Sequence, residues 1–163
     1  PRTAEIVQLI HRIWRQRSDL ESQLVRCPRT IAAAKAQLEA ATQALKQHRD
    51  TIKSKRMEAD RKQIQMRERE AKLYDMECKM NMSKGEREYQ TFKSQIAADK
   101  QANSVLADEI LETLEEIDRL EGQTQEYVDR ELKQKADLSE TEARVNETKA
   151  RLEGDLKLVL AEL

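Results

Sequence analysis

The sequence predicts an all-α fold, a long antiparallel two-helix coiled-coil hairpin. Apolar residues recur at alternating three- and four-residue steps through almost the whole chain, which is the spacing of heptad positions a and d. The phase of this repeat resets once, at residues 81–85, and divides the 163 residues into two nearly equal arms. Composition agrees, because a chain that is 37% charged and 3% aromatic can bury a narrow stripe but not a thick core.

The first arm is expected over about residues 3–80. Its apolar seam positions after the N-terminal segment are Leu20, Leu24, Cys27, Ile31, Ala34, Leu38, Ala41, Leu45, Ile52, Met66, Leu73, Met76 and Met80. His48 occupies a seam position of the same repeat, where a core histidine is expected rather than a metal ligand. Pro28 removes a backbone donor and crowds the carbonyl four residues earlier, while the heptad phase continues through it. We therefore expect a kink or a brief interruption at Pro28 without a change of direction.

The turn is expected at about residues 81–86. Gly85 suits the left-handed backbone conformation of a helix terminus. Ser83 is expected to cap the second arm, with Glu86 three residues later completing a capping box.

The second arm is expected over about residues 87–162. Its apolar seam positions are Tyr89, Phe92, Ile96, Leu106, Ile110, Ile117, Leu120, Tyr127, Leu138, Val145, Leu152 and Val159. Asp99 and Asn103 fill polar seam positions between them. Further apolar residues widen the stripe beyond what one partner helix covers, namely Leu114, Val128, Leu132, Leu156 and Leu160. This excess leaves homo-oligomers open.

A net charge of -1 hides opposite charges on the two arms. Residues 1–84 contain 19 basic and 11 acidic side chains, and residues 85–163 contain 11 and 20, so the arms carry +8 and -9. Each exposed pair contributes only about 0.2–1 kcal/mol, so the charges are expected to choose orientation and register more than to stabilise. Facing residues have numbers that add to 165 or to 172 in the two registers that satisfy the seam, and the first pairs charges slightly better.

The seam is weakest over residues 55–69. The d positions there are Lys55, Lys62 and Arg69. Only Ala59 and Met66 are apolar at a, and the 165 register would set Asp99 and Asn103 nearby. Because polar seam residues lower stability while specifying register, we interpret this stretch as hydrated and slightly loosened rather than as a dedicated partner site.

No motif that carries chemistry is present, and we expect no enzyme activity and no cofactor or metal site in this chain. The two histidines and two cysteines lack ligand spacing, and phosphate loops and nucleophile elbows are absent. Cys27 and Cys78 lie 51 residues apart on one arm, on the order of 75 Å along a straight helix, which excludes a disulfide between them. Both are expected to be buried small hydrophobes.

The N-terminal segment allows two interpretations. Ile6, Ile10 and Ile13 continue the heptad and, in the 165 register, would pack against Leu152 and Val159. The adjacent tryptophan and four arginines describe instead an interfacial membrane helix. We favour core packing and expect no membrane contact. A membrane span is not expected either, since no apolar run of about 18 residues exists. The lack of a recognisable export signal favours the cytoplasm.

Two stretches of the second arm, residues 85–96 and 108–117, resemble bacterial proteins with a long N-terminal coiled-coil hairpin and a C-terminal C4-type zinc ribbon. Members commonly show an Asn-Lys-Glu-Tyr-Gln stretch just after the hairpin tip and a Glu-rich Ile/Leu segment downstream. Glu88, Tyr89 and Gln90 match the first stretch, whereas residues 85–87 depart from it. Pro28 also resembles a family proline in the first arm.

The resemblance implies a zinc ribbon beyond residue 163, because no Cys-x-x-Cys pair occurs in this chain and no zinc ligand can be assigned here. It further implies a non-enzymatic bacterial adaptor, in which the hairpin is a rigid spacer and protein-docking surface. Any nucleic-acid binding would then belong mainly to the ribbon. A partner is expected to reach the hairpin tip at Lys84, Arg87 and Tyr89. Tyr89 also suits a last seam layer against Met76.

Two other functions stay open. The basic first arm could contact nucleic-acid phosphates directly, through Lys53, Lys55, Arg56, Arg61, Lys62, Arg67 and Arg69. The acidic arm beside it and the scarcity of aromatic residues argue against this. The other is a membrane-associated stress scaffold that uses the Trp14 segment.

Overall fold

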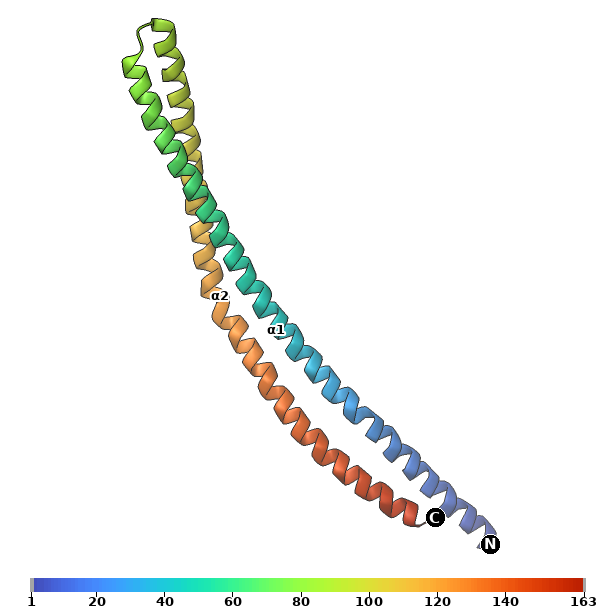
Figure 1. The fold of residues 1–163 in the computed structure, drawn as a ribbon. Helices are drawn as coiled ribbons and strands as arrows, with labels where there is room; N and C mark the ends of the chain where they lie inside the picture. The colour runs from blue at the N-terminus through green and yellow to red at the C-terminus, as the bar shows by residue number, and fades with distance from the viewer. Residues whose placement is uncertain (1, 163) are drawn as a thin grey trace. The chain divides into compact units, whose positions relative to one another are not determined.

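The computed structural model describes residues 2–162 as two long helices. Helix α1 spans Arg2–Met82, helix α2 spans Glu86–Ala161, and residues 83–85 connect them (Figure 1). The two helices pack against each other as an all-α hairpin, and no strand occurs among the described residues. The predicted fold class is confirmed, and each helix begins and ends within two residues of the expected position.

The hairpin divides into two compact units. Unit 2 comprises Lys46–Gln125 and contains the turn. Unit 1 comprises the described residues up to Leu45 and those from Glu126 onward. Each unit is an antiparallel pair of helical segments with apolar side chains buried between them.

The core of unit 1 centres on Cys27, Val145 and Leu152, all buried. Leu20, Leu24 and Ile31 pack against this cluster at the heptad spacing of α1. Unit 2 has two clusters. One contains Ile52, Ala59 and Ile117 with Leu120 beside them, and the other contains Leu73, Met76 and Ile96 with Met80 and Phe92 beside them. Burying apolar area at about 25 cal/mol per Å² is therefore the main force that holds each pair together.

Contacts across the seam fix the register of each unit. In unit 2, His48 hydrogen-bonds Thr124 and Arg69 hydrogen-bonds Asn103, and the numbers of each pair add to 172. Asn103 therefore lies beside Arg69 and not beside Lys62, as the 165 register would require. Of the two registers that the seam pattern left open, the structure has the 172 register, because polar groups inside the seam must find partners and outweigh a slightly better match of exposed charges in the other.

The same register holds in unit 1, where Cys27 packs with Val145 and Leu20 packs against the cluster that contains Leu152. Leu152 was expected to face Ile13. Ile13 is buried, but Ile6 and Ile10 are exposed, so the predicted core packing of these two residues is wrong. In the 172 register the last helical residue of α2, Ala161, is level with residue 11, and most of residues 2–10 lies beyond the described part of its partner helix.

Helix α1 continues through Pro28 without interruption. The brief interruption that was one of the two expectations is therefore absent. Two side chains bind backbone carbonyls beside the proline ring: the Cys27 thiol donates to the oxygen of Gln23 at 3.6 Å, and the Thr30 hydroxyl donates to that of Arg26 at 3.1 Å. Leu24 and Cys27 are anchored in the core of unit 1, so packing keeps this turn helical against the local preference of proline.

The turn differs in detail from the expectation. The Ser83 hydroxyl and backbone N–H both donate to the carbonyl oxygen of Met80, at 2.7 and 3.2 Å, so Ser83 caps the end of α1. The carbonyl oxygen of Gly85 accepts the N–H of Tyr89 at 3.0 Å, which makes Gly85 the N-cap of α2. No glycine within residues 2–162 has a positive φ. The expected left-handed Gly85 and the Ser83–Glu86 capping box are both wrong, because α1 runs closer to the turn than its apolar pattern indicated.

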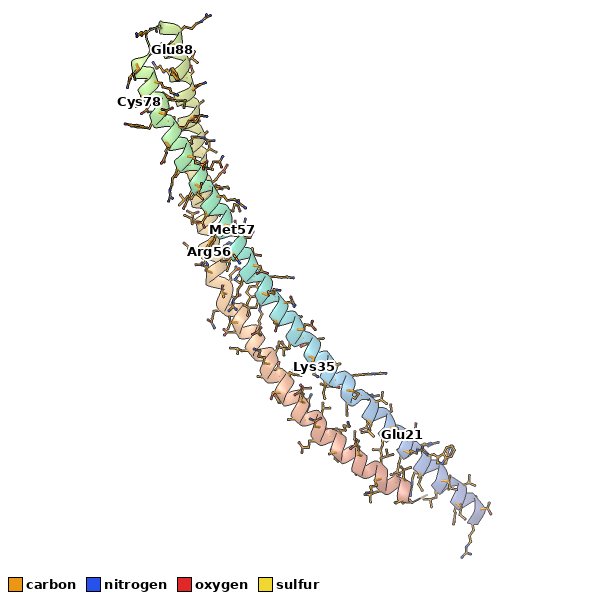
Figure 2. The ribbon with its side chains drawn as sticks, in the orientation of Figure 1. Glu21, Lys35, Arg56, Met57, Cys78 and Glu88 are labelled. Atoms are coloured by element: carbon orange, nitrogen blue, oxygen red, sulfur yellow. The ribbon has the colours of Figure 1, made fainter. Side chains whose placement is uncertain are left out.

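The two cysteines lie in different environments. Cys27 is buried as expected, whereas Cys78 is exposed, near the turn in Figure 2, so its predicted burial is wrong. Among the residues expected to widen the apolar stripe, Leu114, Leu132 and Leu160 are exposed and the other two are half-buried. The second arm thus keeps apolar surface that its partner helix does not cover.

Candidate functional site

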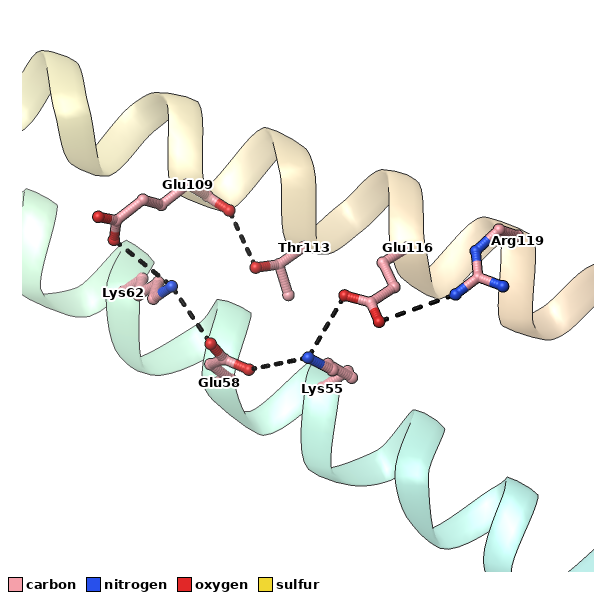
Figure 3. A network of polar contacts seen from close by, with 7 residues as sticks. All are labelled: Lys55, Glu58, Lys62, Glu109, Thr113, Glu116 and Arg119. Carbon is pink, nitrogen blue, oxygen red and sulfur yellow. Dashed lines mark hydrogen bonds and ion pairs between the residues drawn. The ribbon is translucent and has the colours of Figure 1, made fainter.

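The polar stretch of α1 in unit 2 forms a ladder of ion pairs with α2 (Figure 3). Lys55 Nζ lies 3.3 Å from Glu116 across the seam and 3.8 Å from Glu58 on its own helix. Lys62 Nζ lies 3.4 Å from Glu109 across the seam and 3.2 Å from the same Glu58. Glu58 therefore links the two lysines, and each lysine joins both helices.

The seam between the helices beneath this ladder is closely packed rather than loosened. Ala59 is 2% exposed between the two lysines, and Thr113 on α2 is buried as well. The Thr113 hydroxyl donates to the carbonyl oxygen of Glu109 at 2.9 Å, so its polar atom is satisfied within its own helix. Small residues at these two seam positions let the helices approach, and the long lysine stems cover the contact from outside. The predicted hydration and loosening of this stretch is not what the structure shows.

Two further polar seam residues are satisfied across the hairpin. The Asn103 side-chain oxygen accepts from the Arg69 guanidinium at 3.4 Å, and its amide donates to the backbone oxygen of Met66 at 3.3 Å. His48 Nε2 and the Thr124 hydroxyl are 3.0 Å apart, and His48 is buried at the seam position that the heptad indicated. Among the described residues no buried side-chain nitrogen or oxygen lacks a partner. These contacts specify the register and satisfy the polar seam residues within the hairpin.

The charges of the ladder shift two pKa values in opposite directions. The hydrogen bond from Lys62, and then the positive charges of Lys62 and Lys55, lower the pKa of Glu58. The hydrogen bond to Glu58 raises the pKa of Lys62 against a smaller opposing effect of desolvation, and Glu109 contributes in the same direction. Both shifts favour the ionised pair in the folded hairpin.

These directions predict that the ladder stabilises the fold at intermediate pH and that this stabilisation is lost in acid and in alkali. A carboxyl with a lowered pKa contributes stability above the usual glutamate value of 4.5, and loses it as the pH falls through the folded value. An amine with a raised pKa contributes below the usual lysine value of 10.5, and loses it as the pH rises through the folded value. We therefore expect Glu58→Gln to lower the thermal midpoint at neutral pH, and its difference from wild type to vanish in acid.

Thermal unfolding followed by circular dichroism from pH 2 to pH 7 would measure this difference. The matched control is Glu70→Gln, an exposed glutamate on the same helix that forms no ion pair within residues 2–162. An equal loss in both variants at neutral pH would contradict the role of the ladder. Added salt is expected to shrink the Glu58→Gln effect, since these groups are reached by solvent.

The seven basic residues considered for phosphate contact do not form one free stripe. Lys55, Lys62 and Arg56 pair with glutamates of α2, Arg56 with Glu121, and Arg69 binds Asn103. The remaining three, Lys53, Arg61 and Arg67, are exposed and form no ion pair with any described residue. The structure thus neutralises much of the basic arm, and phosphate binding stays a prediction that rests on three separated side chains.

The hairpin tip brings together the three residues expected to meet a partner. Lys84 and Arg87 are exposed beside the turn, and no ion pair engages them within the described chain. Tyr89 is exposed by 37% and does not belong to the last cluster, in which Met76 packs with Ile96. The alternative expectation that Tyr89 closes a seam layer against Met76 is therefore wrong.

Two exposed residues near the tip were missed by the sequence reasoning. Tyr74 is 71% exposed and Met82 is 80% exposed, both on the last turns of α1. Neither occupies position a or d, so the heptad assignment itself was the available signal that they point away from the seam. Met82 and Tyr89 each lie two residues in sequence from one of the two unpaired cations, Lys84 and Arg87, whereas Tyr74 lies eight residues before the end of α1.

Comparison of the chain with protein-family models, with curated proteins and with solved structures gives no match. Within residues 2–162 no helix combines the length and the apolar character that crossing a membrane requires. The same residues contain no group of three or more histidine, cysteine, aspartate or glutamate side chains placed to hold a metal ion. Because Met82, Lys84, Arg87 and Tyr89 are all exposed around the turn, the tip is the candidate functional site among the described residues.

Proposed function

We propose that this chain is a non-enzymatic scaffold that binds a protein partner at its hairpin tip. The observation that carries the proposal is the contrast between the two parts of unit 2. Polar side chains of the seam are satisfied within the hairpin, whereas the tip exposes Met82 and Tyr89 beside Lys84 and Arg87, with Tyr74 exposed further along α1. Tyrosine and arginine are the residue types that dominate the energetics of protein interfaces, since they combine a large apolar contact with hydrogen bonding.

The remainder of the hairpin acts in this proposal as a spacer between the tip and whatever the chain is joined to. An antiparallel pair of helices is suited to this task, because its backbone hydrogen bonds are internal and its register is specified by polar seam contacts. A zinc ribbon joined to the second arm, as the family resemblance implies, would add a second binding module. Such a protein would recruit its partner without performing chemistry.

The triple variant Lys84→Ala/Arg87→Ala/Tyr89→Ala is expected to keep its helicity and lose its partner. A photo-crosslinking amino acid at position 88, on the first turn of α2, is the most direct probe, since Glu88 is exposed near the turn (Figure 2). Crosslinking in cell extract should yield one discrete adduct, and the triple variant should reduce it at least about tenfold if the three residues contribute hot-spot energies of about 1–2 kcal/mol.

The matched control is Arg29→Ala/Lys35→Ala, which removes two exposed cations from unit 1 and leaves the tip unchanged. An adduct that survives the triple variant, or that the control removes equally, would refute binding at the tip. Circular dichroism on each variant separates loss of partner from loss of fold.

A further inference from the structure

The outer face of α1 in unit 2, opposite the seam, has exposed apolar side chains at one repeating heptad position. Met57 and Ile64 are 52% and 53% exposed, and the small, exposed Ala71 follows at the same spacing. At 3.6 residues per turn, Ile64 lies roughly 170° around the helix from the middle of the seam positions Ala59 and Lys62. Helix α2 runs along the opposite side of α1 over this whole stretch, so the exposure of the outer face does not depend on where either helix ends.

Four exposed charges flank this apolar line in a self-complementary order. Asp60 and Arg67 lie on one flank of Ile64, and Arg61 and Glu68 lie on the other, each within about 60° of Ile64 around the helix. All four side chains are exposed, and none forms an ion pair with any described residue. Each flank therefore has one acid and one base, with Ile64 between them along the helix, and the charges of the face cancel.

A second copy of the same face satisfies this order. In an antiparallel pair of helices related by a two-fold axis at Ile64, each flank meets the same flank of the other helix. Asp60 then meets Arg67 of the second copy, and Arg61 meets Glu68 of the second copy. The two-fold axis repeats both contacts, so every charge of the face gains an opposite partner. A ligand of one charge sign, such as nucleic acid, would instead meet an acid beside every base.

Residues further from the axis favour the antiparallel orientation over a parallel one. It sets the large Met57 against the small Ala71 of the second copy, which lets the two faces interdigitate. It also sets Lys53, which is exposed and forms no ion pair with a described residue, against the ring of Tyr74, which is 71% exposed. A cation over a tyrosine ring is attractive. A parallel pair would place the exposed carboxylate of Asp50, the preceding residue of the line, against its own copy.

We propose that the outer face of α1 over residues 53–74 is an antiparallel homodimer interface centred on Ile64. The proposal goes beyond the tip function, because Lys84, Arg87 and Tyr89 take no part in it. A contact between two single helices buries less than the about 1,200 Å² at which stable complexes begin. We therefore expect a weak dimer that salt weakens further, with a dissociation constant on the order of 0.1 mM.

Sedimentation equilibrium of the full chain at low salt measures this dimer. Arg67→Asp should raise the dissociation constant about tenfold or more, because the two-fold axis turns two attractive pairs into two repulsive ones. The swapped variant Asp60→Arg/Arg67→Asp restores opposite charges across the axis, and its dissociation constant should return to within about threefold of wild type. The matched control is Lys35→Asp, which makes the same change of charge at an exposed position of unit 1 and should dimerise as wild type does.

Crosslinking tests the orientation of the two copies. Cys27→Ala and Cys78→Ser remove the native thiols, and Met57→Cys protein is then mixed with mass-tagged Ala71→Cys protein and a short bismaleimide. We expect the mixed 57–71 product to exceed either homodimer. A monomer at every concentration up to about 1 mM would overturn the proposal. So would a swapped variant that stays as weak as Arg67→Asp while circular dichroism shows full helicity, or a crosslink of each variant mainly to itself.

Discussion

The variant Ala59→Cys/Thr113→Cys is expected to form an intramolecular disulfide and to gain about 4 kcal/mol in the free energy of unfolding. The 172 register sets these two seam positions opposite each other, and both native side chains are buried and small. Cysteine is close to them in size, so the substitutions leave the surrounding packing nearly unchanged. The gain arises from the unfolded state, because the bond closes a loop of more than fifty residues around the turn.

The measurement is denaturant unfolding of the oxidised and reduced protein, with the bond confirmed by mass spectrometry. Cys27→Ala and Cys78→Ser are introduced first, so that only one pair of thiols remains. The control pair is Ile52→Cys/Thr113→Cys, which faces only in the 165 register. Linkage of the control pair in place of the first would show that unit 2 adopts the other register in solution.

The fold was accessible to sequence reasoning because it depends on periodicity. Two helices, one turn and an antiparallel seam follow from the heptad and from a single change of phase, and neighbouring residues alone decide these features. Burial at Leu45, His48 and Ile117 follows from the same pattern. Structure of this kind needs no knowledge of which residues meet across the hairpin.

The register of the two helices and the capping at the turn could not be predicted from periodicity. A heptad looks the same after a shift of seven residues, so the choice depends on individual polar partners such as Thr124 for His48 and Asn103 for Arg69. The capping prediction at the turn was wrong for a related reason. The Ser83 hydroxyl donates to the Met80 carbonyl at the end of α1 and does not cap the start of α2. Short polar side chains serve either end of a helix, and only the position of the helix end decides which.

The candidate site was predicted only in part. Lys84, Arg87 and Tyr89 are exposed at the tip as expected, but the exposure of Tyr74 and Met82 was not considered. Isolated exposed side chains carry no periodic signal, so a pattern search passes over them. Ile6 and Ile10 fit the heptad, which predicts them in the core, but both are exposed.

Pro28→Ala is expected to stabilise the hairpin by about 2 kcal/mol. Helix α1 is unbroken at this position, so alanine can restore the hydrogen bond from its own N–H to the carbonyl of Leu24. Proline costs about 3 kcal/mol relative to alanine inside a helix, and the greater flexibility of the unfolded alanine chain offsets about 0.5–1 kcal/mol of the gain. The relief is expected in unit 1, where Leu24 packs against the core.

Urea unfolding of Pro28→Ala beside Arg29→Ala separates this effect from a general change of helix propensity, since Arg29 is the exposed neighbour and already a good helix former. Gly122→Ala gives a calibration of about 1 kcal/mol, because nothing lies within 4 Å of the added carbon. An unchanged midpoint in Pro28→Ala would contradict this prediction, because it would mean that the missing bond to the Leu24 carbonyl has no measurable cost. A gain larger than that of Gly122→Ala would instead show that tertiary packing keeps α1 helical through Pro28 against a local cost, and that the heptad outweighs the strongest helix-breaking residue in the chain.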